Sequence, residues 1–195
     1  MTERSPAGDP ATLRVAAGFC PGAEVPREAD VEVVPRQIGR RPSGRFFVAS
    51  RCPLGKPQVI LTLPGIGEGA TPPLLWLSCP ELNRRVGGLE SSGAVGRYRE
   101  RLEREPAAGE RFLEEEESVS RAHSALAREI GGDELDSALG PRGAAGGTPG
   151  AVKCLHAHLA FRLATGEGTL GGWCLQDICG GDWQGCERPH EVCID

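Results

Sequence analysis

Three short apolar segments lie close together along the chain and predict a small β-sheet. Residues 45–52 (RFFVASRC) and 56–64 (KPQVILTLP) are rich in β-branched and aromatic residues, and the turn-forming segment Pro53–Gly55 separates them. A looser loop then leads to residues 74–79 (LLWLSC). Because the connections are short, the three segments predict an antiparallel meander, and other elements must cover one face of so small a sheet.

The spacing of apolar positions changes after residue 79 and predicts helices. Pro80 suits the first turn of a helix, and Leu82, Val86 and Leu89 then recur at helical spacing until Ser92–Gly93 interrupts them. Three further helices are predicted over about 94–104, over 107–130 and over 152–164. Gly131–Gly132 ends the second of these, and Gly166 ends the third.

The two ends of the chain show no sustained period. Residues 1–34 contain four prolines and predict a weakly ordered leader, whereas residues 167–195 form a tail rich in glycine and cysteine. The fold class expected is therefore α+β, with a domain over 35–166. In that domain a small antiparallel β-meander is packed by about four helices, between a disordered leader and a Cys-rich tail.

Composition and charge limit the possible function classes. The chain has 195 residues, with 22 Lys and Arg against 27 Asp and Glu, and its net charge of −5 argues against a protein that coats nucleic acid. No apolar stretch approaches the ~20 residues that span a bilayer. No apolar segment of signal-peptide length is visible at the N-terminus. We therefore expect a cytoplasmic protein that binds neither nucleic acid nor membrane.

Two charged segments leave alternatives open. Arg36, Arg40, Arg41 and Arg45 form either a solvated segment or a local site for a small anion. The four consecutive acids of Glu114–Glu117 are expected on a solvated helix face, with a metal-binding carboxylate cluster as the alternative.

The segment around Cys154 carries the clearest chemical signal. On a helix, Cys154 and His158 lie one turn apart on one face, while His156 points to another flank. A cysteine in the first turn is placed where the helix dipole favours the thiolate, so Cys154 is a candidate nucleophile with His123 or His156 as its partner. The alternative is a small buried cysteine and two histidines at the edge of an apolar stripe.

The eight cysteines also suggest metal binding, because a reducing cytoplasm favours free, metal-bound or catalytic thiols. Cys52 and Cys79 each end a predicted strand, and together with Cys154 and one histidine they would form a Cys₃His set suited to zinc or an iron–sulfur cluster. Cys20 is isolated and is expected to have no role. The tail cysteines could form a second cluster; these are Cys174, Cys179, Cys186 and Cys193.

Several motifs resemble the uncharacterised bacterial family DUF501. They are RQIGRRPSG at 36–44, VASRCPLGKPQVI at 48–60, PPLLWLSCP at 72–80, LESSG at 89–93, the AH pair at 122–123 and VKCLHAHLAFRLATG at 152–166. The resemblance implies a small α+β domain of unknown activity, encoded near genes of cell division and polyphosphate metabolism. The family motifs fall on Arg51, Cys52, Cys79, His123, Lys153, Cys154 and His156.

In relatives the position of Cys79 can be occupied by His, an exchange that a metal ligand tolerates. The family motif contains His156 more securely than His158, although the helical wheel favours His158 as the partner of Cys154. The leading hypothesis is therefore a zinc or iron–sulfur site formed by Cys52, Cys79, Cys154 and His156 or His123. Arg51 and Lys153 would then lower a thiolate pKa or bind an anionic substrate. The alternatives are an interaction module in cell division or envelope regulation, which has a protein partner, and an enzyme with Cys154 as nucleophile.

Overall fold

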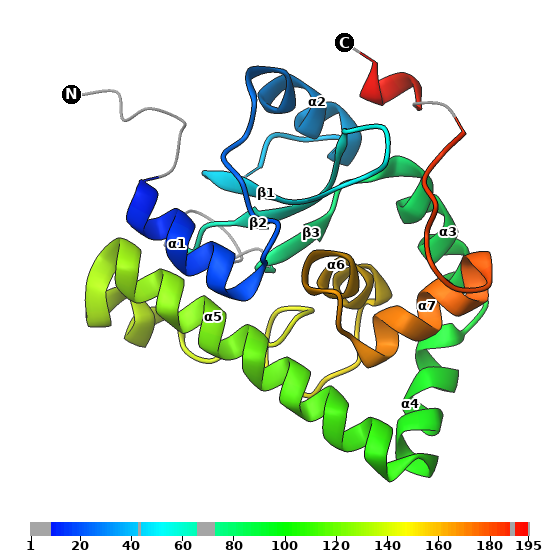
Figure 1. The fold of residues 1–195 in the computed structure, drawn as a ribbon. Helices are drawn as coiled ribbons and strands as arrows, with labels where there is room; N and C mark the ends of the chain where they lie inside the picture. Colours follow the sequence, from blue (N-terminus) through cyan, green and yellow to red (C-terminus); the bar gives the residue numbers. More distant parts are fainter. Residues whose placement is uncertain (1–8, 43, 66–72, 188–189, 195) are drawn as a thin grey trace.

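A three-stranded antiparallel sheet lies at the centre of the computed structural model, which describes residues 9–194 except 43, 66–72 and 188–189 (Figure 1). The strands β1 (Phe46–Arg51), β2 (Pro57–Thr62) and β3 (Leu75–Leu77) are paired in the order β1-β2-β3. Phe46 is opposite Thr62, and Ile60 is opposite Trp76. The predicted meander is therefore confirmed. Gly55 closes the β1–β2 turn at φ +74°, a conformation that glycine adopts without strain.

The helices after the sheet follow the sequence pattern closely. They are α3 (Pro80–Ser91), α4 (Ala94–Arg104), α5 (Pro106–Leu139) and α6 (Leu155–Thr165). In α5 the predicted end at Gly131–Gly132 is a kink, where Gly132 has φ +69° and the chain resumes a helix as far as Leu139. The α+β class is confirmed.

The leader and the tail contain more helix than the sequence pattern predicted. The expectation of a weakly ordered leader is wrong for residues 9–34, which contain α1 (Pro10–Phe19) and most of α2 (Glu28–Ile38); residues 1–8 lie outside the described residues. Asp9 caps α1 and Pro10 takes its first position, where a missing N–H costs nothing. The tail contains α7 (Thr169–Cys179) and a short 3₁₀ helix, η1 (Glu191–Cys193).

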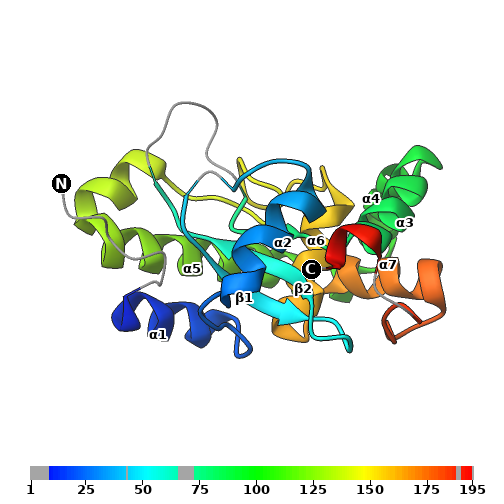
Figure 2. The ribbon, with the colours of Figure 1, turned by 90° about the horizontal axis from the view of Figure 1, so that it is seen from above.

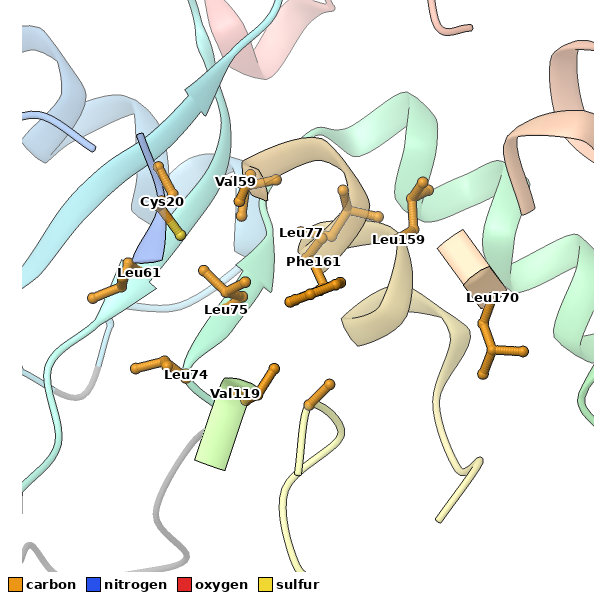
Figure 3. Close-up of a cluster of buried hydrophobic side chains, with 14 of the residues drawn as sticks. Cys20, Val59, Leu61, Leu74, Leu75, Leu77, Val119, Leu159, Phe161 and Leu170 are labelled. Carbon is orange, nitrogen blue, oxygen red and sulfur yellow. The ribbon is translucent and has the colours of Figure 1, made fainter. Parts of the chain in front are cut away.

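The helices cover both faces of the sheet. On one face, α2 packs its Val34 against Phe46, Val48 and Ile60. On the other face, α6 lies between the sheet and the long helix α5, with α1 and α7 beside it (Figures 1 and 2). Figure 3 shows this second and larger core, in which Val59, Leu61 and Leu75 of the sheet face Leu159 and Phe161 of α6. Helix α6 is thus the central packing element of the fold.

The tail returns to the sheet after α7. It runs along α3 and ends with η1 beside α2 (Figure 1), so that Cys193 is almost fully buried. Within the described ranges, no helix combines the length and the apolar character needed to span a bilayer.

Candidate functional site

Three metal-ligating side chains meet where α6 begins. The carboxylate of Glu90, the thiol of Cys154 and the imidazole of His156 offer donor atoms that all lie within 4.8 Å of one another. His156 Nδ1 is 3.3 Å from Glu90 Oε1 and 3.8 Å from Cys154 Sγ. In the part of the chain that the structure describes, no other three such donors are gathered so closely.

The start of α6 places these side chains. Cys154 is the N-cap residue with an extended backbone (φ −141°), so the helical-wheel argument that paired it with His158 does not apply. The backbone N–H of Leu155, one of the first unpaired amides of α6, donates to Glu90 Oε1 at 2.6 Å. The carboxylate thus caps the helix and lies beside the thiol, which is why Glu90 belongs to the site.

The orientation of the His156 ring is fixed by a backbone group of α3. Nε2 lies 3.2 Å from the Asn83 carbonyl oxygen, and because a carbonyl only accepts, Nε2 carries the proton and donates it. Asn83 is itself held by its Nδ2, which donates to the Leu77 carbonyl. Nδ1 is therefore the nitrogen that faces Cys154 and Glu90.

The charges around His156 favour its protonated form. Contact with Cys154 raises the pKa of His156 to about 9, and the Glu90 carboxylate adds to the rise, although burial opposes it. A metal ion that binds Nδ1 must therefore displace a proton, and its affinity will depend on pH.

A cavity of about 530 Å³ opens beside Cys154 and His156. Its walls are mostly apolar and include Leu75, Trp76 and Leu77 of β3. The Arg40 guanidinium stacks over the Trp76 ring at 4.4 Å, although Arg40 itself does not border the cavity. The arrangement offers an apolar surface next to reactive side chains.

The structure separates the other predicted metal ligands from Cys154. Cys52 and Cys79 border a second cavity together with Cys186 and Cys193 of the tail. The predicted Cys₃His set is thus divided between two places, and so is the predicted tail cluster. Cys174 is fully buried in the main core, and Cys179 is exposed at the end of α7. Cys20 is a fully buried core residue, as expected of a cysteine without a chemical role.

Two of the other histidines, His123 and His158, lie inside the protein. Burial lowers the pKa of His123, with the Arg142 charge as a second cause, and lowers that of His158 to about 4. His158 Nδ1 is 3.8 Å from a carboxylate oxygen of Glu116. Glu116 is 2% exposed, so the solvated face expected for the acidic run does not include it. Its two oxygens accept the backbone N–H groups of Ala144 and Gly150, which anchors the glycine-rich loop.

The two predicted anion-binding residues lie elsewhere. Arg51 forms ion pairs with Glu24 and Asp30 and donates to the Gly55 carbonyl, so it joins α2 to the sheet. Lys153 borders a separate cavity of about 480 Å³ with Phe112 and Leu113. Glu90 had no place among the predicted ligands, although it lies in the LESSG motif at 89–93.

Comparison with known proteins adds one finding. The family described as a protein of unknown function (DUF501) matches residues 48–176, which include Glu90, Cys154 and His156. The match ends before Cys179, Cys186 and Cys193. Neither a curated protein nor a solved structure matches the chain.

Proposed function

We propose that this chain, which belongs to the DUF501 family, binds a zinc ion between Glu90, Cys154 and His156. The observation that carries the proposal is the approach of a carboxylate, a thiol and an imidazole to within 4.8 Å of one another. Thiolate, imidazole and carboxylate are the ligand types of zinc, and a three-ligand protein site keeps a fourth position open, as catalytic zinc sites do.

The surroundings of His156 support a metal ligand. Metal-bound histidines usually donate their second ring N–H to a carbonyl or carboxylate, which fixes the tautomer and orients the ring. Asn83 supplies that carbonyl to Nε2, and Nδ1 is left facing the other two ligands. His123 and His158 have no such arrangement, since the Nε2 atom of each is buried without a hydrogen-bond partner among the described residues.

The cavity beside the site supports a role beyond structure. A zinc ion with an open position polarises a bound water or a substrate oxygen as a Lewis acid. The apolar wall formed by Leu75, Trp76 and Leu77 would hold the body of a small substrate. We place this chemistry in the cytoplasm, where reducing conditions keep all eight cysteines free, as they are in the structure.

Zinc stoichiometry tests the proposal. Protein purified under reducing conditions is loaded with zinc, passed over a desalting column and analysed for metal, as wild type and as Cys154→Ser, His156→Gln and Glu90→Gln. The first two variants should lose about one equivalent of zinc, and Glu90→Gln should bind it more weakly. Cys179→Ser is the matched control, because Cys179 is exposed and distant from the site in sequence. Unchanged zinc content in Cys154→Ser and His156→Gln would contradict the proposal.

One observation favours a second function, in which Cys154 is a nucleophile. Its sulfur lies at the N-terminus of α6, 3.8 Å from His156 Nδ1, which is the arrangement of a cysteine–histidine nucleophile pair. In this case metal-free protein should react at Cys154 with a thiol reagent faster than at Cys179, and His156→Gln should remove the difference. Equal rates at the two cysteines would exclude this function.

A further inference from the structure

The second cavity, which contains Cys52 and Cys79, lies where the tail returns to the sheet. Cys52 follows β1 and opens the tight β1–β2 turn, in which Gly55 N–H donates to the Cys52 carbonyl. Cys79 is the N-cap residue of α3 and is 6% exposed. Cys186 and Cys193 approach from the tail, and all four residues border one enclosed space of about 20 Å³.

Independent contacts hold the tail in this position. A Cβ atom placed on Gly185 would lie 2.9 Å from the Pro53 ring, so the backbone beside Cys186 touches the residue after Cys52. Gln37 of α2 donates from Nε2 both to Cys193 Sγ, at 3.2 Å, and to the Pro57 carbonyl, at 3.0 Å. Both contacts place tail cysteines against the β1–β2 turn without any bond between the thiols.

All four cysteines are free thiols, so each can serve as a ligand. Lys56 and Glu81 border the same space.

We propose that Cys52, Cys79, Cys186 and Cys193 form a four-thiolate zinc site that fastens the C-terminal tail to the family domain. Four cysteine ligands are a common set for a structural zinc ion, which leaves no position open. This site is separate from the one that contains Cys154, and either can exist without the other.

Binding requires the four sulfur atoms to move closer together. No three of the four sulfur atoms lie within 4.8 Å of one another, whereas ligands of a tetrahedral zinc ion must approach more closely. The tail can supply this movement, because Cys186 lies in an irregular segment and η1 has only three residues. Cys52 and Cys79 are held by the sheet and by α3, so they form the fixed half of the site.

A zinc ion bound by these cysteines would explain how the tail, which has little apolar surface, is ordered. Ile194 is 54% exposed, and Trp183 is partly buried against the main core, with the Arg85 guanidinium 5.1 Å from its ring. Metal binding contributes directly to folding free energy where the ligands are brought together only in the folded state. Zinc removal should therefore release the tail while the rest of the fold persists.

The test uses full-length protein in which Cys154→Ser has removed the other proposed site. This protein should retain about one equivalent of zinc, and further substitution by Cys186→Ser or Cys193→Ser should remove it. Two matched controls should keep the metal. Cys20→Ala changes a buried core cysteine, and His190→Ala changes a residue that borders the cavity but uses its Nδ1 to accept the Val192 N–H.

Cobalt and limited proteolysis give readouts that do not depend on stoichiometry. Co²⁺ bound by four thiolates should give the strong sulfur charge-transfer and tetrahedral ligand-field absorption that a site with one sulfur lacks. A chelator should speed cleavage of the chain after residue 180, and zinc should restore protection. Absence of zinc and cobalt from the Cys154→Ser protein, or a disulfide between any two of the four cysteines after anaerobic purification, would overturn the proposal. Neither result would affect the site at Cys154.

Discussion

Two adjacent glycines of α7 should respond in opposite ways to the same substitution. A Cβ atom on Gly171 would lie 2.5 Å from the backbone carbonyl oxygen of His158 and in collision with the Arg162 side chain, so α7 could not keep its distance from α6. Overpacking of this kind costs ~1–3 kcal/mol. A Cβ atom on Gly172 would meet nothing within 4 Å, and alanine there should stabilise the helix by ~0.5–1 kcal/mol.

Gly171→Ala and Gly172→Ala should thus differ by about 3 kcal/mol in the free energy of unfolding, in favour of Gly172→Ala. For a chain of this length that is a difference of ~6–12 °C in melting temperature. Circular dichroism melts under reducing conditions measure it, with urea unfolding as a second determination. Equal melting temperatures would refute the close crossing of α6 and α7, on which the position of Cys154 and His156 depends.

Three further substitutions test buried ionisable side chains. Arg51→Lys cannot keep every contact of the guanidinium and should destabilise the protein by ~1–3 kcal/mol in urea unfolding at pH 7. Burial raises the pKa of Asp30, but its contacts, with the Arg51 guanidinium first among them, lower it by more, so the folded-state pKa lies below its usual value. The stability that the Arg51–Asp30 pair contributes should therefore be lost as the pH falls through the folded-state pKa of Asp30. Glu116→Gln should cost ~1–3 kcal/mol, because an amide cannot accept two backbone N–H groups with both its ends, and protease cleavage within 143–150 should increase. His158 has a lowered folded pKa, so it should contribute stability above pH 6.5 that is lost as the pH falls towards 4, by up to about 3 kcal/mol; His158→Leu should flatten this dependence in acid titrations of stability.

The sheet and α3–α6 could be predicted because their signals are local. Apolar runs bounded by Pro53–Gly55 define two strands, and the i, i+4 spacing from Leu82 defines α3. The helices α1, α2 and α7 were missed because their sequences contain residues that usually interrupt helices. Pro35 lies inside α2, and Gly171–Gly172 lie inside α7, where the close approach to α6 requires the first of these glycines.

The site could be predicted only in part for a related reason. Cys154 and His156 are two residues apart, so their proximity follows from local structure, but Glu90 reaches them only because α3 packs against α6. The acid sits 64 residues before Cys154 and has no distinctive spacing to it. The association of Cys52 and Cys79 with the tail depends likewise on the path of the chain after α7, which no sequence period encodes.

Helix α3 connects the two proposed sites. Cys79 is its N-cap, Asn83 one turn later holds His156 Nε2, and Glu90 near its end is a ligand of the other site. Because Cys79 is 6% exposed, a serine hydroxyl at this buried position should shift the start of α3 and with it both Asn83 and Glu90. Cys79→Ser should therefore weaken zinc binding at the Cys154 site, whereas Cys186→Ser, which removes only a tail ligand, should leave it nearly unchanged. Competition with a chromophoric chelator measures both affinities, and equal weakening by the two variants would show that the tail, and not α3, couples the sites.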